Sequence, residues 1–150
     1  LSFEQQSGAF LTDLVKKGEI TLVYSPISFL DRNSGNEYSS RALNAALCVL
    51  DKGGIEKYKT MHDLLYANQP QEGTIGPEDA ALIATAKTAG VTGIESCVNS
   101  KRFGPWIDKA GDKLQEDGFK GTPWVRIDGK DVEAPTPAAL QKAIDAAKKA

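Results

Sequence analysis

The chain has 150 residues and a mass of 16.1 kDa, the length of one domain with a substantial core. Its 18 basic and 20 acidic residues give a net charge of -2 and form no block of like charge, which argues against a nucleic-acid partner. The longest apolar run covers only residues 45–50, whereas a membrane-spanning helix requires roughly 20 apolar residues. Two cysteines and one histidine do not complete a zinc site, so we expect no metal and no cofactor.

The first 36 residues predict a helix, a strand and a turn. Apolar groups at helical spacing over residues 3–15, with Ser7 on the same face, predict a helix that stops at Gly18. The β-branched and aromatic run of residues 20–24 predicts one mostly buried strand. Residues 31–36, which include Asp31, Arg32 and Asn33, are typical of a solvated turn.

Residues from about 37 to 117 predict helices only. Glycines and prolines separate the segments: the Gly53–Gly54 pair ends a first helix, Gly90 ends a helix that Pro77 opens, and Gly118 ends the last one. The expected helices cover residues 37–53, 55–68, 77–90, one or two turns at 94–98, and a final segment from Trp106 to residue 117.

The C-terminal segment predicts a hairpin and a helix. Residues 124–127 alternate like a strand, Asp128–Gly129 is a hairpin turn signal, and residues 130–132 return. Thr136 is placed to cap a last helix that Pro137 opens. One strand and one hairpin form too small a sheet for this many helices. We therefore expect a further strand, encoded before Leu1, that lies between residues 21–25 and residues 124–127 in the sheet.

Three stretches resemble the DsbA-like branch of the thioredoxin superfamily. Residues 118–124, Gly-Phe-Lys-Gly-Thr-Pro-Trp, resemble the family's loop that ends in a cis-proline before a strand, and residues 58–69 resemble its insert helix. Residues 3–6 resemble the continuation of the helix that carries the redox motif. The resemblance covers essentially all 150 residues and implies one α/β domain: a thioredoxin-like fold with an all-helical insert at about 37–117, whose central N-terminal strand is absent from this sequence.

The family's C-x-x-C motif is absent from the 150 residues. Residues 1–4 resemble those that directly follow it, so the resemblance implies that the motif lies just upstream of Leu1. There the helix N-terminus would lower the pKa of its first cysteine and make the disulfide oxidising.

Thr122 and Pro123 are the candidate site residues within the chain. Base rates favour a trans bond before Pro123, because only about 5–6% of X-Pro bonds are cis. The resemblance implies a cis bond that lets the backbone of Thr122 pair with an extended substrate peptide, and it places Leu1 close to Pro123.

Cys48 and Cys97 leave two interpretations open from composition alone, a pair of buried thiols or one long-range disulfide. A redox-active pair is disfavoured, because neither cysteine opens a helix. Within the family resemblance we expect a structural disulfide, which requires an oxidising compartment. His62 is expected to pack without a catalytic role, and Trp106 and Trp124 to be core or groove-lining residues.

The leading hypothesis is a thiol-disulfide oxidoreductase of the cell envelope that acts on reduced or misoxidised polypeptides and is recycled by a membrane redox partner. The alternative is a redox-inactive thioredoxin-fold module that only binds peptides. A glutathione-linked isomerase is a third hypothesis. That chemistry would need a lone serine or cysteine at the first helix, and Ser2 lies after the expected position.

Overall fold

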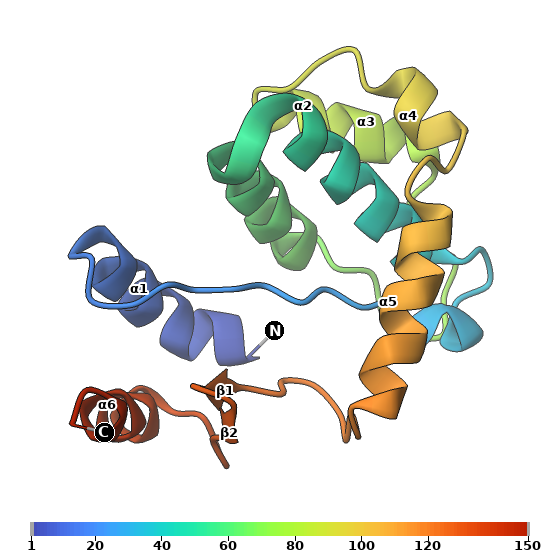
Figure 1. Ribbon diagram of the computed structural model, residues 1–150. Coiled ribbons are helices and arrows are strands. Elements are labelled where there is room, and N and C mark those ends of the chain that lie inside the picture. The colour runs from blue at the N-terminus through green and yellow to red at the C-terminus, as the bar shows by residue number, and fades with distance from the viewer. Residues whose placement is uncertain (1, 150) are drawn as a thin grey trace. The chain divides into compact units, whose positions relative to one another are not determined.

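The computed structural model describes residues 2–149 and divides the chain into two compact units. The first unit comprises the residues up to Tyr24 together with those from Gly118 onward, and the second comprises Ser25–Asp117. The second unit thus contains the region predicted as the helical insert. Figure 1 shows the elements of both units.

In the first unit, helix α1 (Ser2–Lys16) packs against helix α6 (Pro137–Ala147), which also contacts strand β1 (Arg126–Ile127). As predicted, Ser7 lies on the buried face of α1, where its Oγ donates a 3.2 Å hydrogen bond to the carbonyl of Pro135. The predicted cap of α6 is also confirmed, because the Thr136 side chain accepts from the backbone N–H of Ala139 at 3.3 Å.

The predicted hairpin is confirmed. Strand β1 pairs antiparallel with β2 (Lys130–Asp131), with Arg126 opposite Asp131 and Ile127 opposite Lys130. The two turn residues, Asp128 and Gly129, have φ values of 47° and 79°, the left-handed backbone that a tight two-residue hairpin needs.

The predicted strand over residues 20–24 is wrong. Exposure alternates along these residues as it would in a strand, but no backbone hydrogen bond within residues 2–149 joins them to another segment. A strand exists only when its N–H and C=O groups meet a partner, and no described segment supplies one. Residues 124–127 do not pair with them either, as expected if the two segments are not direct neighbours.

The second unit is built around the long helix α2 (Tyr38–Ala67), which contacts the short 3-10 helix η1 (Phe29–Asn33) and three further helices. These are α3 (Asp79–Thr88), α4 (Glu95–Asn99) and α5 (Gly104–Glu116). A core cluster of Leu43, Leu47 and Ile107, with Leu50 and Phe103 packed against it, holds α5 on α2.

Three details of the second unit differ from the sequence-based expectations. Helix α3 begins at Asp79 and not at Pro77, because Glu78 has extended backbone and its carbonyl accepts the first helical hydrogen bonds. Of the two places expected for Trp106, the core or the lining of a groove, the core is excluded, because the residue is 49% exposed beside the buried Ile107. Asp31, expected in a solvated turn, instead accepts a 3.0 Å hydrogen bond from the backbone N–H of Ser40 and so caps α2.

Candidate functional site

The segment that joins α5 to the hairpin carries the candidate site, and we call its residues 120–123 the proline loop. Glycines allow the chain to turn here, with φ values of 82° at Gly118 and 146° at Gly121. The Thr122–Pro123 peptide bond is cis. Both residues are exposed to solvent and can therefore be reached by another chain.

Aromatic residues lie at both ends of the proline loop. Phe119 precedes it and Trp124 follows it, and their ring centroids are 6.1 Å apart with a tilted interplanar angle of 57°. The Trp124 indole has two further partners in the hairpin: its Nε1 donates a 2.9 Å hydrogen bond to Asp131 Oδ1, and the Arg126 guanidinium lies 4.4 Å from the ring centroid. Sequence analysis identified Trp124 but neither of these hairpin partners.

The disulfide between Cys48 and Cys97 is present. Cys48 lies on α2 and Cys97 on α4, their sulfurs are 2.00 Å apart, and their Cα atoms are 6.0 Å apart. Cys48 is buried and Cys97 is partly exposed at a groove of about 440 Å³, which Asp51, Lys52 and Arg102 also line. Since these are the chain's two cysteines, no free thiol remains in the 150 residues.

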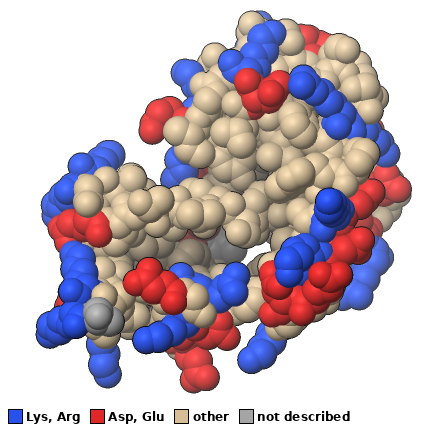
Figure 2. Space-filling view, in the orientation of Figure 1, with Lys and Arg blue, Asp and Glu red and all other residues tan. Residues whose placement is uncertain are grey.

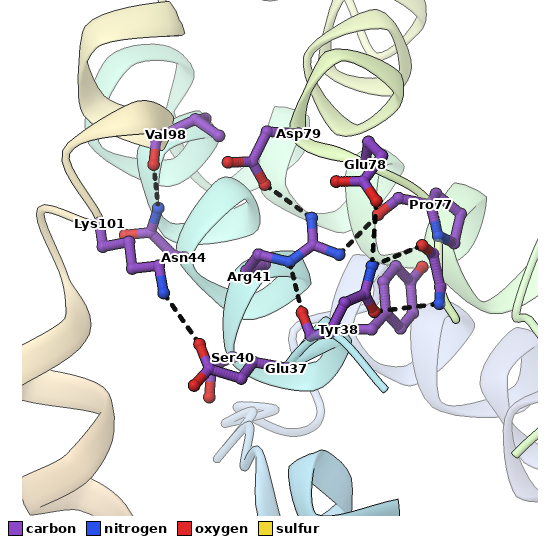
Figure 3. A network of polar contacts seen from close by, with 12 residues as sticks. Glu37, Tyr38, Ser40, Arg41, Asn44, Pro77, Glu78, Asp79, Val98 and Lys101 are labelled. Atoms are coloured by element: carbon purple, nitrogen blue, oxygen red, sulfur yellow. Dashed lines mark hydrogen bonds and ion pairs between the residues drawn. The ribbon is translucent and has the colours of Figure 1, made fainter. Parts of the chain in front are cut away.

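A polar network fixes the start of α2 against the start of α3 (Figure 3). Arg41, whose side chain is 9% exposed, forms a 2.7 Å ion pair with Asp79 and donates to the carbonyls of Asn36 and Pro77 at 2.8 and 2.9 Å. The side chain of Asn36 in turn bonds both the N–H and the carbonyl of Gly76. These groups are engaged with one another, which assigns them to the scaffold.

Two further positions extend this network along α2 (Figure 3). Asn44 donates to the carbonyl of Val98 at 3.2 Å and accepts from the backbone N–H of Phe103 at 2.9 Å, which ties α2 to the segment between α4 and α5. At the surface Lys101 forms a 2.9 Å ion pair with Glu37, and this contact raises the pKa of the lysine and lowers that of the glutamate. Sequence analysis identified none of these residues, because a single arginine or asparagine on a helix forms no sequence motif that would predict its contacts.

His62 packs as expected. Its ring lies between those of Tyr58 and Tyr66 on successive turns of α2, 6.4 and 4.7 Å away between centroids, and its side chain is 11% exposed. Burial raises the pKa of Tyr58 to about 12. This aromatic row is a packing feature of α2, and it lies in a different unit from the proline loop.

The residues that the structure describes include no cluster of three potential metal ligands and no helix that could span a bilayer. The predicted proximity of Leu1 to Pro123 falls outside residues 2–149. Of the predicted site residues, Thr122 and Pro123 lie together in the first unit, whereas the cysteine pair lies in the second.

The chain is similar to known proteins over nearly its whole length. Residues 2–146 match the family model described as Thioredoxin. A reduced disulfide bond oxidoreductase (DsbG) from Mycobacterium tuberculosis is 36% identical with a TM-score of 0.83, and the match covers 96% of this chain and 69% of that one. Oxidized DsbA from the same organism is 36% identical with a TM-score of 0.82, covering 96% and 74%. No curated protein is significantly similar to the sequence.

Proposed function

Because this chain belongs to the DsbA-like branch of the thioredoxin superfamily, we propose that the protein exchanges disulfides with cysteines of folding polypeptides in the cell envelope. The observation that carries the proposal is the exposed Thr122–Pro123 segment at the start of the hairpin, on a chain similar to solved disulfide oxidoreductases. The proposal assigns to Thr122 and Pro123 the binding of an extended substrate segment.

The proposal assigns the redox step to a C-x-x-C motif encoded just before Leu1, as the resemblance of residues 1–4 to the segment after that motif implies. A substrate thiolate attacks one sulfur of the motif's disulfide, forms a mixed disulfide, and releases the other motif sulfur as a thiolate. A second substrate thiolate then attacks the substrate sulfur of the mixed disulfide. The substrate gains a disulfide, the motif becomes a dithiol, and two electrons have passed to the protein; a membrane redox partner removes them afterwards.

Two observations support the proposed location and partner. Disulfides such as Cys48–Cys97 are typical of oxidising environments and rare in the cytosol, which favours a place outside the cytoplasm. On the face drawn in Figure 2, acidic side chains gather at the lower right with basic ones beside them, and the basic side chains form no continuous area. Such a surface favours a polypeptide partner over a phosphate backbone.

The test uses the full-length protein, including the residues encoded before Leu1. We expect it to oxidise a two-cysteine peptide, measured as loss of free thiols, and a variant with serines in the C-x-x-C motif to be inactive. Cysteine mapping by mass spectrometry should find Cys48 and Cys97 still bonded to each other throughout turnover. Exchange of Cys48 or Cys97 with the substrate would contradict the assignment of the redox step to the motif.

The alternative, a redox-inactive module that binds peptides, is favoured by the absence of C-x-x-C from the 150 residues. The same experiment separates the two functions. A full-length protein that binds unfolded peptides but leaves their thiols reduced would replace the oxidoreductase with the binding module.

A further inference from the structure

We propose that Asp131 is a positioning residue for the proline loop. Its carboxylate holds the indole of Trp124, the residue directly after Pro123, and thereby holds the loop in the conformation that binds substrate. The inference rests on the proposed function and deepens it, because it names a residue outside the loop that controls how tightly the peptide is bound.

The Trp124 indole is held by both strands of the hairpin. From β2, Asp131 accepts the Nε1 proton across 2.9 Å; from β1, the Arg126 guanidinium covers the ring at 4.4 Å from its centroid. The hydrogen bond fixes one edge of the indole and the cation–π contact fixes one face. Rotation of the side chain about either of its two torsions would break at least one of these contacts.

The register of the hairpin places these groups on one side. Side chains two residues apart on a strand point to the same face, so Trp124 and Arg126 share a face. Asp131 lies opposite Arg126 in the ladder and therefore also projects to that face. A slip of one residue would send the carboxylate to the other side, so the left-handed turn at Asp128 and Gly129 is what brings it within reach of the indole.

Trp124 also contacts the residue at the other end of the proline loop. Its ring lies 6.1 Å from that of Phe119, and these two residues border the four loop residues on either side. The loop itself is exposed at Thr122 and Pro123, so its outer part has little packing to hold it. Its position therefore depends on its two ends, and the orientation of one end depends on Asp131.

A held loop binds peptide more tightly because less conformational freedom is lost on binding. A purely structural role for Asp131 makes a different prediction. The hydrogen bond to Trp124 is exposed to solvent, and its loss as a stabilising contact alone would lower the melting temperature slightly and leave the peptide affinity of the folded protein unaltered.

The experiment measures binding of a fluorescein-labelled extended peptide, with serine in place of cysteine, to the full-length protein by fluorescence anisotropy. We expect Asp131→Ala and Trp124→Phe each to raise Kd about fivefold, the equivalent of one hydrogen bond of about 1 kcal/mol. Trp124→Phe keeps an aromatic six-membered ring but removes the pyrrole half of the indole together with its N–H donor. Asp131→Asn keeps an acceptor oxygen at the same place and should restore Kd to within about twofold of the wild-type value.

Lys130→Ala is the matched control, because Lys130 is an exposed neighbour of Asp131 on β2 that projects to the opposite face. Turnover of the corresponding two-cysteine peptide provides a second readout, in which Asp131→Ala should raise KM with kcat within about twofold of wild type. Melting curves of every variant establish that each is folded at the assay temperature.

The possible outcomes are distinct. Unaltered peptide affinity in Asp131→Ala and Trp124→Phe would overturn the inference, and so would an Asp131→Asn variant as weak as Asp131→Ala. A loss of kcat with constant KM would also overturn it, since the residue would then act on the chemical step. Weakened binding in a protein that oxidises no thiol would uphold the positioning role while rejecting the oxidoreductase function.

Discussion

The charged side chain of Arg41 is buried, and its hydrogen-bond partners make that burial energetically possible. The guanidinium meets the carboxylate of Asp79, the first residue of α3, and the backbone carbonyls of Asn36 and Pro77, which precede α2 and α3. A buried charge is costly unless it is paired and hydrogen-bonded, and this one is both. Arg41 therefore ties the start of α2 to the segment that leads into α3, in the unit that also contains the disulfide.

We expect Arg41→Ala to lower the free energy of unfolding by about 2–4 kcal/mol, because it leaves two carbonyls and the Asp79 carboxylate without their donor. Arg102→Ala is the matched control. Arg102 pairs with Asp51 at 3.0 Å, but both side chains are about half exposed, so its loss should cost less than about 0.5 kcal/mol. Urea denaturation of both variants measures the difference, and equal effects would show that the Arg41 network carries no special stability.

At the residue scale, the sequence predicted the residues whose chemistry is visible without context. Composition left Cys48 and Cys97 as either buried thiols or a disulfide, and the family resemblance favoured the bond that the structure has. Thr122–Pro123 was singled out by a loop sequence that resembles the family's. Arg41 and Asp131 could not be found in this way, because their roles arise from partners 38 and 7 residues away. The Asp128–Gly129 turn sets the hairpin register, and that register places Asp131 on the same face as Trp124. The sequence therefore contained the information needed to pair these two residues.

At the scale of elements, α2 shows how one glycine shapes a long helix. Its 30 residues run as one helix except at Gly54, where φ is 77° and ψ is -177°. That combination is open essentially only to glycine, since a Cβ would clash with the neighbouring backbone. The kink lets the two halves of α2 point in different directions, as the ribbon in Figure 1 shows.

We expect Gly54→Ala to lower the free energy of unfolding by about 1–3 kcal/mol, although nothing lies within 4 Å of the added Cβ. The cost is one of backbone conformation alone. Gly111→Ala is the control, because Gly111 lies inside α5 and an added Cβ there also meets nothing within 4 Å. This substitution should stabilise by about 0.5–1 kcal/mol. Opposite signs in denaturant unfolding support the kink, and a stabilising Gly54→Ala would contradict it.

Elements whose hydrogen bonds lie within one segment were predicted well. The helices α1, α5 and α6 and the β1–β2 hairpin each close their own hydrogen bonds, and glycine, proline or threonine signals mark their ends. Residues 20–24 carry an equally clear strand pattern and form no strand. A strand requires a partner that its own sequence does not encode, which is why this prediction failed.

For the whole molecule, the predicted thioredoxin-like fold with a helical insert is confirmed by the family match and by the solved structures. In the sequence, the fold was implied by the three stretches that resemble the family, at residues 3–6, 58–69 and 118–124, and the predicted order of elements agreed with it. The division into two units follows from that order: the helical stretch packs on its own core, and the N- and C-terminal segments pack on each other.

The Cys48–Cys97 disulfide connects α2 to α4 within the second unit and closes a segment with a sequence separation of 49. Cross-linking a loop of that length restricts the unfolded chain and stabilises the folded one by about 4 kcal/mol in the chain-entropy model. We therefore expect the double substitution Cys48→Ala and Cys97→Ala to lower the free energy of unfolding by about that amount, measured in guanidinium chloride.

Reductant provides the control for this prediction. Dithiothreitol should destabilise the wild-type protein and leave the double variant unaffected, because only the former has a Cys48–Cys97 bond to lose. Both experiments are carried out in a background where any cysteine encoded before Leu1 is serine, so that the effect belongs to this bond alone. If reductant destabilised the double variant as much as the wild type, the stabilisation would have another source, and the inference of an oxidising compartment would lose its main support.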